Sequence, residues 1–192
     1  MTETRADLIL AESRGDVSAL RKVLGASDPS LRSLALGSLA KLNALDSGDL
    51  REALTDEAAT VRCRAIDLAI PEPSIDLVPA LDDQDDLVVE TAAWALGERE
   101  VAAPEIIDRL SALAADHDVS ICREAAIAAL GAIGAERGLP AILAGMQDRA
   151  PVRRRAVLAL APFASPEVTA ALTTALTDRD RQVRQAAEDL LG

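Results

Sequence analysis

Residues 122–131 of the chain read CREAAIAALG, and this segment decides the fold. Cys122, Ala126 and Leu130 recur every four residues, so they fall on one side of a helix with 3.6 residues per turn. The pattern occurs six times in the 192 residues, at spacings of 30, 27, 34, 30 and 31. The six copies are LRSLALGSLA from Leu31, VRCRAIDLAI from Val61, VVETAAWALG from Val88, CREAAIAALG from Cys122, VRRRAVLALA from Val152 and VRQAAEDLLG from Val183. Self-similarity at such a period indicates a repeat architecture.

Several positions are nearly constant among the copies. When the first residue of each segment is position zero, position four is Ala in all six copies and position eight is Leu in five, with Ala69 the exception. Position one is Arg in five copies, at Arg32, Arg62, Arg123, Arg153 and Arg184. An acid precedes each segment by three or four residues, at Asp28, Glu57, Asp85, Asp118, Asp148 and Asp180. We expect this acid to cap the helix, and the Ala to let neighbouring helices approach closely.

A shorter apolar-periodic stretch precedes these helices, as in DVSALRKVL from Asp16, SIDLVPAL from Ser74, PEIIDRLSAL from Pro104 and PEVTAALTTAL from Pro166. Each unit is therefore predicted to be a helical hairpin. The predicted fold class is all-α, with about six helical hairpins and an N-terminal cap helix that covers the first repeat. We expect a single domain over residues 1–192, with the cap helix at about 3–14 and repeats at about 16–42, 46–70, 74–99, 104–134, 137–162 and 166–192.

The segments VVETAAWALG and CREAAIAALG, each preceded by an acid, resemble HEAT repeats of the short type first recognised in phycobilin lyases. Pro79 in LVPAL and Pro140 in GLPAIL are also similar to the family. The resemblance covers roughly residues 16–192. It implies a right-handed α-solenoid, an armadillo-like alpha-alpha superhelix, whose second helices line a concave face. It also implies a ladder between adjacent repeats, made by the Arg at position one and the acid before it.

Two repeats depart from this pattern. The second ends in Ile70 and PEP at residues 71–73, and the third has Val89 where the ladder Arg is expected. Two acidic clusters occupy equivalent turns around the third and fourth repeats: Asp82, Asp83, Asp85 and Asp86 in DDQDD, and Asp116 and Asp118 in DHD. Surplus helix capping is the ordinary explanation. As an alternative, we hypothesise that this acidic edge attracts a cation or an Arg/Lys-rich segment, and pairing of every carboxylate with an Arg of a neighbouring repeat would contradict it.

The composition argues against several classes of protein. Aromatics are only 1% of the chain, which disfavours a β-sandwich or barrel, and a net charge of −12 disfavours a nucleic-acid binder. Charges interrupt every apolar run, and MTETRADLIL lacks the basic start of a secretory signal, so we expect no membrane association and a cytoplasmic location. Cys63 and Cys122, without a CxxC pair, fit a reducing compartment.

The chain has a single histidine, His117, which restricts the kinds of enzyme that it could be. Deoxyhypusine hydroxylases use HEAT repeats with several His-Glu pairs for a di-iron centre, and one His followed by Asp118 cannot supply them. Cys122 is at position zero, which faces the core, and His117 lies in a turn where we expect a solvated side chain. We therefore predict no catalytic, cofactor or metal site. A bilin-lyase-like or other small-molecule enzyme stays open as an alternative, as does a structural subunit of a larger assembly.

The expected binding surface is the side of the second helices that carries positions two, six and nine. Periodicity places Trp94 there near the middle of the chain, with burial between helix layers as the alternative, and Trp is enriched in binding hot spots. Arg153 belongs to the ladder, whereas Arg154 and Arg155 are expected to project freely. We predict a non-catalytic scaffold that binds a protein or peptide on the concave face, with six candidate residues: Glu90, Trp94, Glu124, Arg154, Leu158 and Arg155.

The charge is distributed unevenly. Residues 1–136 carry 12 basic and 26 acidic side chains, whereas residues 137–192 carry 8 and 6. This polarity predicts a groove that directs the acidic end of a ligand toward the fifth repeat, or weak head-to-tail self-association.

Overall fold

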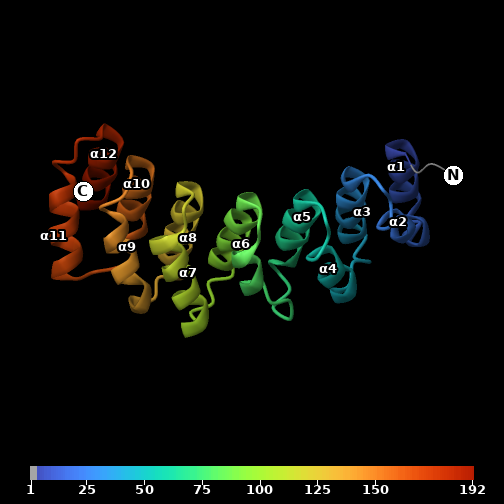
Figure 1. The fold of residues 1–192 in the computed structure, drawn as a ribbon, viewed down its shortest axis with the longest axis horizontal. Helices are drawn as coiled ribbons and strands as arrows, with labels where there is room; N and C mark the ends of the chain where they lie inside the picture. Colours follow the sequence, from blue (N-terminus) through green and yellow to red (C-terminus); the bar gives the residue numbers. More distant parts are fainter. Residues whose placement is uncertain (1–3) are drawn as a thin grey trace. The chain divides into compact units, whose positions relative to one another are not determined.

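The computed structural model describes residues 4–192, and every regular element in this range is a helix (Figure 1). The helices follow one another as hairpins, so the fold is the predicted all-α repeat solenoid. The chain divides into two compact units, residues 1–80 and 81–192, which are described separately. The predicted single domain and its repeat boundaries stay predictions. None of the described helices has the length and apolar character needed to cross a membrane.

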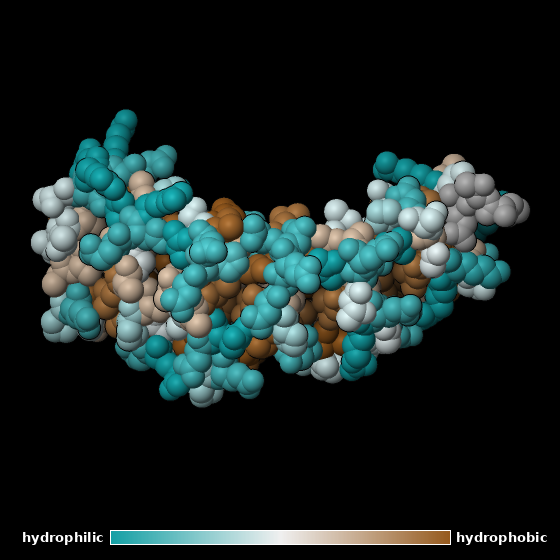
Figure 2. Space-filling model, viewed as in Figure 1, coloured by the Kyte–Doolittle hydropathy of each residue, from teal (hydrophilic) through white to brown (hydrophobic). Residues whose placement is uncertain are grey.

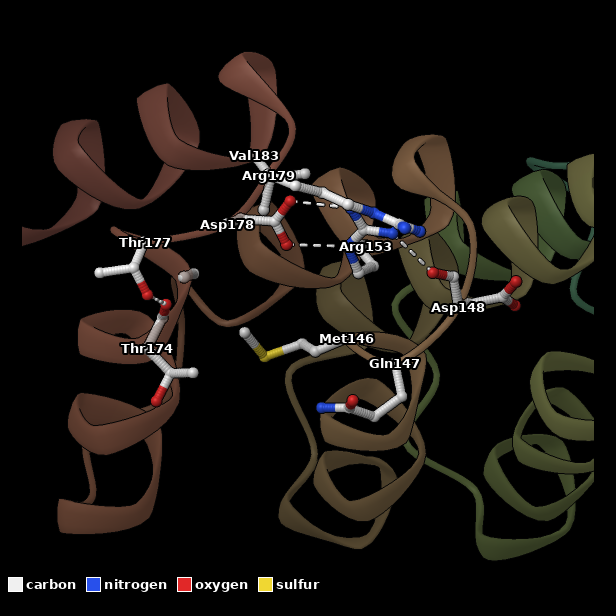
Figure 3. A pocket seen from close by; sticks show the side chains of 10 residues that line it. Met146, Gln147, Asp148, Arg153, Thr174, Thr177, Asp178, Arg179 and Val183 are labelled. Carbon is white, nitrogen blue, oxygen red and sulfur yellow. Dashed lines mark hydrogen bonds and ion pairs between the residues drawn. The ribbon is translucent and has the colours of Figure 1, made fainter.

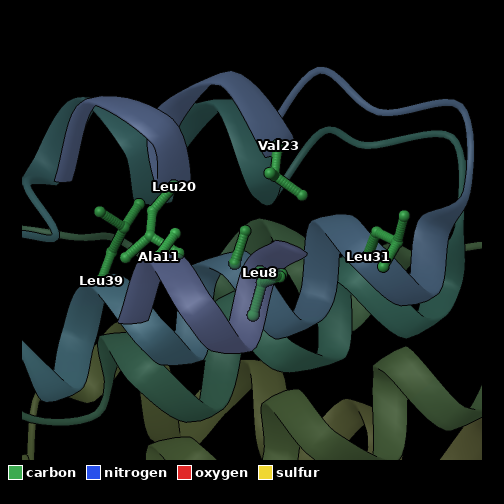
Figure 4. Packing of buried hydrophobic residues seen from close by; sticks show 7 residues of the cluster. Leu8, Ala11, Leu20, Val23, Leu31 and Leu39 are labelled. Carbon is green, nitrogen blue, oxygen red and sulfur yellow. The ribbon is translucent and has the colours of Figure 1, made fainter. Parts of the chain in front are cut away.

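Unit 1 consists of the opening helix and two hairpins. Its helices are α1 (Arg5–Arg14), α2 (Val17–Val23), α3 (Pro29–Lys41), α4 (Ser47–Ala53) and α5 (Ala59–Ala69). Helix α1 packs on α2 and α3, in the place expected for the cap helix. Leu8 and Ala11 of α1 meet buried side chains of the first hairpin, among them Leu20 and Leu39, in one apolar cluster (Figure 4). The opening helix is therefore held by burial of its apolar side.

Unit 2 contains the remaining hairpins. Its α-helices are α6 (Asp86–Glu98), α7 (Pro104–Asp116), α8 (Ser120–Ile133), α9 (Leu139–Gly145), α10 (Ala150–Ala159), α11 (Pro166–Ala175) and α12 (Arg181–Leu191), with a short 3-10 helix η2 (Glu136–Gly138) before α9. The second helices form a continuous row, because α6 packs on α8, α8 on α10 and α10 on α12. The first helices α7, α9 and α11 each pack against the second helix of their own hairpin.

The first element of the third repeat differs from the prediction. The stretch SIDLVPAL, expected to be an α-helix from Ser74, contains only the 3-10 helix η1 (Val78–Asp82), and the boundary between the two units falls within it. Pro71 and Pro73 lie just before the stretch and Pro79 lies within it, and proline has no backbone N–H to donate to a helix. The apolar side chains of Ile75 and Leu77 are nevertheless buried.

Position −3 is the N-cap of every second helix. Asp28, Asp85 and Asp180 occupy it, and their carboxylates accept N–H groups of the first turn. The expectation of an acidic cap is wrong for α5, α8 and α10, whose caps Ala58, Val119 and Arg149 make no capping hydrogen bond with their side chains. In these three repeats the predicted acid lies at position −4, one residue too early to cap.

The ladder implied by the family resemblance is present in both units. Arg32 bridges to Asp56, Arg123 to Asp148 and Arg153 to Asp178, each through two hydrogen bonds of 2.6 to 2.8 Å. Figure 3 shows the last of these pairs between the hairpins of α10 and α12. Asp56 is thus the main ladder acid of Arg32, with the predicted Glu57 a second partner at 3.4 Å. Arg153 binds Asp178 rather than the predicted Asp180.

Two glycines at position nine bring the second helices of unit 2 into backbone contact. A Cβ added to Gly97 would lie 2.8 Å from the Cα of Ala129, and one added to Gly131 would lie 2.7 Å from the Cα of Ala159. Both distances are shorter than real Cβ contacts allow, so only glycine permits this spacing. Position nine was expected on the open face, but Gly97 is instead buried at the contact between α6 and α8.

Candidate functional site

The six predicted binding residues all lie on three neighbouring helices of unit 2, here called the α6–α10 face. Trp94 and Glu90 belong to α6, Glu124 to α8, and the remaining three to α10. Trp94 is 47% exposed and Leu158 is 37% exposed, so both side chains reach solvent. The indole of Trp94 is therefore not buried between helix layers. Periodicity alone did not decide between this burial and exposure to solvent.

Arg155 differs from its prediction. It was expected to project freely, but its guanidinium lies 3.4 Å from a carboxylate oxygen of Glu124. Arg154 is exposed, and no ion pair or hydrogen bond of its side chain occurs among residues 4–192. The cationic side chain available to a ligand on α10 is therefore Arg154, whereas Glu124 and Arg155 partly neutralise each other.

Two exposed apolar residues belong to the same face and were not predicted. Leu87 on α6 is 53% exposed and Ile121 on α8 is 44% exposed. Both occupy position −1, which at 100° per residue lies beside position six on the helix surface. Extending the repeat pattern one residue toward the N-terminus would have found them. Leu87, Trp94, Ile121 and Leu158 together are here called the apolar strip.

The apolar strip is confined to these three helices. At the equivalent positions, the other second helices carry Ser30, Thr60 and Gln182 at position −1, and Gly37, Asp67 and Asp189 at position six. On the side of the molecule seen in Figure 2, hydrophilic side chains cover most of each unit, and hydrophobic atoms form small patches between them. A set of large exposed apolar side chains therefore distinguishes the α6–α10 face.

Cys122 and His117 would be the nucleophile and the base if the chain used a thiol for catalysis. Cys122 is fully buried, and burial together with the nearby charges of Asp86 and Glu90 raises the pKa of its thiol to about 11. Such a thiol is protonated at neutral pH and is a poor nucleophile. His117 is not the solvated residue expected, because its side chain is only 22% exposed and its Nδ1 accepts the N–H of Val119.

A cavity of about 390 Å³ lies between the α9–α10 and α11–α12 hairpins (Figure 3). Its charged lining includes Asp148, Arg153 and Asp178. Arg153 and Asp178 bind each other, and Asp148 is bound by Arg123. Because these charges are already paired, they are arranged to join repeats rather than to exchange protons with a substrate.

The acidic edge is only partly neutralised. Asp82 pairs with Arg109 of the neighbouring repeat at 2.5 Å, and Asp85 caps α6. Asp86 lies 3.8 Å from Nε2 of His117 and has no Arg partner among the described residues. The condition that would contradict the hypothesis of a bound cation or basic segment is therefore not met, and the hypothesis stays a prediction.

Comparison with known proteins agrees with this architecture. A family model described as HEAT repeats matches residues 75–161, and a model of the PBS lyase HEAT-like repeat matches residues 152–178. No curated protein matches the chain in sequence. Two crystal structures of engineered proteins, targets OR329 and OR366 of a structural genomics consortium, are 21% and 20% identical to the chain, with TM-scores of 0.59 and 0.66. Each alignment covers 92% of this chain and at least 95% of the other.

Human deoxyhypusine hydroxylase, solved in complex with glycerol, aligns over 95% of this chain at 19% identity with a TM-score of 0.41, which carries no argument about activity. The repeated Ala and Leu positions, the ladder, the stacked hairpins and both family matches agree with one another. Residues 75–161 match HEAT repeats and residues 152–178 match the PBS lyase HEAT-like repeat, so the predicted resemblance to HEAT repeats of this type is confirmed over residues 75–178.

Proposed function

We propose that the chain is a non-catalytic scaffold that binds a protein or peptide segment on the α6–α10 face. The observation that carries this proposal is the apolar strip, whose four large side chains are 37 to 53% exposed. Covering apolar surface is favourable by about 25 cal/mol per Å². Large apolar side chains exposed on one face among polar residues mark a candidate protein interaction site.

The charges at the two ends of the face favour one orientation of the ligand. Arg154 on α10 offers an unpaired guanidinium, and Glu90 on α6 offers a half-buried carboxylate without an ion pair among the described residues. A peptide with an apolar centre would therefore direct an acidic residue toward Arg154 and a basic residue toward Glu90. We propose this class of peptide as the ligand.

Rigidity of the α6–α10 face supports the same proposal. Gly97 and Gly131 hold α6, α8 and α10 in backbone contact, and Arg123 and Arg153 tie successive turns together. A surface fixed in this way loses little conformational entropy on binding, so the ordering cost falls on the ligand. We keep the cytoplasm as the proposed location, because the two cysteines lie in different units without a pairing motif.

The test is a selection of displayed random peptides on the intact protein, followed by titration of the selected peptides. Trp94 is the only Trp and the chain has no Tyr, so its fluorescence reports directly on the proposed site. Trp94→Ala should weaken binding roughly 30-fold, as expected for a hot-spot residue. Arg154→Glu should weaken peptides with an acidic end and spare those without one.

Matched controls are available on the same unit. Val101 is 45% exposed and lies after the end of α6, and Arg181 is an exposed arginine of α12. Val101→Ala and Arg181→Glu should leave peptide affinity unchanged, as measured with labelled peptides. Equal affinity of wild type and Trp94→Ala for every selected peptide would refute the proposed site.

A further inference from the structure

We propose that Asp86, His117 and Cys122 form a binding site for a divalent cation of the zinc type. The carboxylate, imidazole and thiol each offer one ligand atom, and these atoms lie within 4.8 Å of one another. They come from three segments of unit 2: the start of α6, the turn after α7, and the first turns of α8. Nitrogen, sulfur and carboxylate oxygen are the ligands that Zn²⁺ takes in proteins.

The site occupies the place of a missing ladder contact. In the first, fourth and fifth repeats, an Arg at position one binds an Asp of the following turn, as Arg123 binds Asp148. Between the third and fourth repeats, Val89 replaces the Arg, and His117 occupies position −5 of the turn, where Asp56 and Asp178 serve as ladder acids. Repeat packing alone therefore does not account for the residues found here.

The repeat pattern also explains how His117 is held. Asp56 and Asp178 at position −5 each accept the N–H of position −3, and Nδ1 of His117 accepts the Val119 N–H in the same way, at 3.1 Å. The other ring nitrogen, Nε2, is then directed toward the carboxylate of Asp86, 3.8 Å away. The imidazole thus points from the turn to the start of α6.

Cys122 is the buried member of the cluster. Position zero is Leu or Val in the other five repeats, so a sulfur at this place is an exception within the chain. Its thiol donates to the backbone carbonyl of Asp86 at 3.4 Å, which places the sulfur beside the start of α6. Asp86 is 53% exposed and His117 is 22% exposed, so a cation can reach these two side chains from solvent. The Cys122 sulfur is buried directly behind them, and a cation reaches it when these side chains rearrange.

The local charge favours a cation. Asp86 and Glu90 both act electrostatically on the Cys122 sulfur, and the guanidinium of Arg123 is occupied by Asp148 and by the carbonyl of His117. Binding would release the proton of the Cys122 thiol to solvent and leave a thiolate as the ligand. The positive charge of the cation would then neutralise the negative charge of this thiolate.

Binding requires two small rearrangements. Ligand atoms of a tetrahedral zinc site lie roughly 3.5 Å apart, so rotation of the exposed Asp86 side chain must close the present cluster. The hydrogen bond from Val119 places the imidazole proton on Nε2, so the ring must turn and carry its proton on Nδ1 when Nε2 coordinates. The backbone of the turn is held independently, because Arg123 donates to the carbonyls of His117 and Asp118.

The test uses Co²⁺ as a spectroscopic probe of the metal-free, reduced full-length protein. Coordination by a thiolate produces a near-ultraviolet charge-transfer band, which should saturate at one equivalent and disappear when Zn²⁺ is added. Cys63→Ser should retain this band, whereas Cys122→Ser should lose it. Absence of a band in the wild type, or its persistence in Cys122→Ser, would overturn the proposal.

Surface variants keep the test decisive if Cys122→Ser proves unstable. Asp86→Asn alters an exposed side chain and His117→Gln a partly exposed one. Each should weaken Co²⁺ binding at least about 10-fold, with circular dichroism showing an intact helical fold. Asp118→Asn is the matched control, because it removes a neighbouring exposed carboxylate that is outside the cluster. Equal weakening by Asp118→Asn and Asp86→Asn would show diffuse attraction to the acidic edge and would overturn the site.

Discussion

Replacing Arg153 with Met should destabilise unit 2 by about 3 kcal/mol, whereas the same change at Arg154 or Arg155 should cost much less. The three arginines are consecutive on α10, but their surroundings differ. Arg153 is only 6% exposed and makes two hydrogen bonds of 2.8 Å to Asp178. A third bond of 2.8 Å joins it to the carbonyl of Asp148.

The magnitude follows from what each substitution leaves behind. Met preserves the aliphatic packing of Arg153 but leaves the Asp178 carboxylate, 16% exposed, without its counter-charge. Removal of one partner of a buried ion pair costs about 3 to 5 kcal/mol, and we expect the lower value because Asp178 retains some hydration. Arg155 and Glu124 form a longer and more exposed pair, worth about 0 to 1 kcal/mol, and Arg154 has no such pair among the described residues.

Urea unfolding of the three variants, followed by Trp94 fluorescence, measures these differences within unit 2. The midpoint should fall for Arg153→Met with an unchanged dependence on urea concentration. Adding Asp178→Asn to Arg153→Met should restore part of the loss, because it removes the unpaired charge. Equal stabilities of the Arg153→Met and Arg154→Met variants would refute the assignment of the ladder as a stabilising contact.

Three further predictions concern packing and pH. Gly131→Ala should destabilise the protein by about 1 to 3 kcal/mol in urea unfolding despite the better helix propensity of Ala, because its Cβ would meet the Ala159 backbone, and Ala159→Gly should partly compensate. Hydrogen bonds from ladder arginines lower the pKa of Asp148 and Asp178. The stability that these carboxylates contribute is therefore complete above the unfolded pKa of about 3.9 and is lost as pH falls through the folded pKa. Urea unfolding midpoints that do not fall over this acid range would contradict this prediction. Leu20→Ala should cost about 2 to 5 kcal/mol by calorimetry, because Leu20 is fully buried where α1 and the first hairpin meet.

The repeat pattern predicted only part of the candidate site. Periodicity predicts that Trp94 and Leu158 lie on the open side, and both side chains are exposed, because one angular rule holds along the whole of a regular helix. It missed Leu87 and Ile121, which lie one residue before the segment used to define the repeat. It also left Arg155 free, although Glu124 on the next helix binds it. Pairing between helices depends on side-chain reach across a contact, which sequence position does not give.

Local chemistry along the sequence determined the hairpin class of fold, the Ala and Leu core positions and the family resemblance, because each depends on a period repeated six times. Tertiary structure decided which acids complete the ladder, why only Gly97 and Gly131 fit between their helices, and how Asp86, His117 and Cys122 meet. The physical reason is that helix formation follows from neighbours along the chain, whereas each of these features depends on distances between residues about one repeat apart.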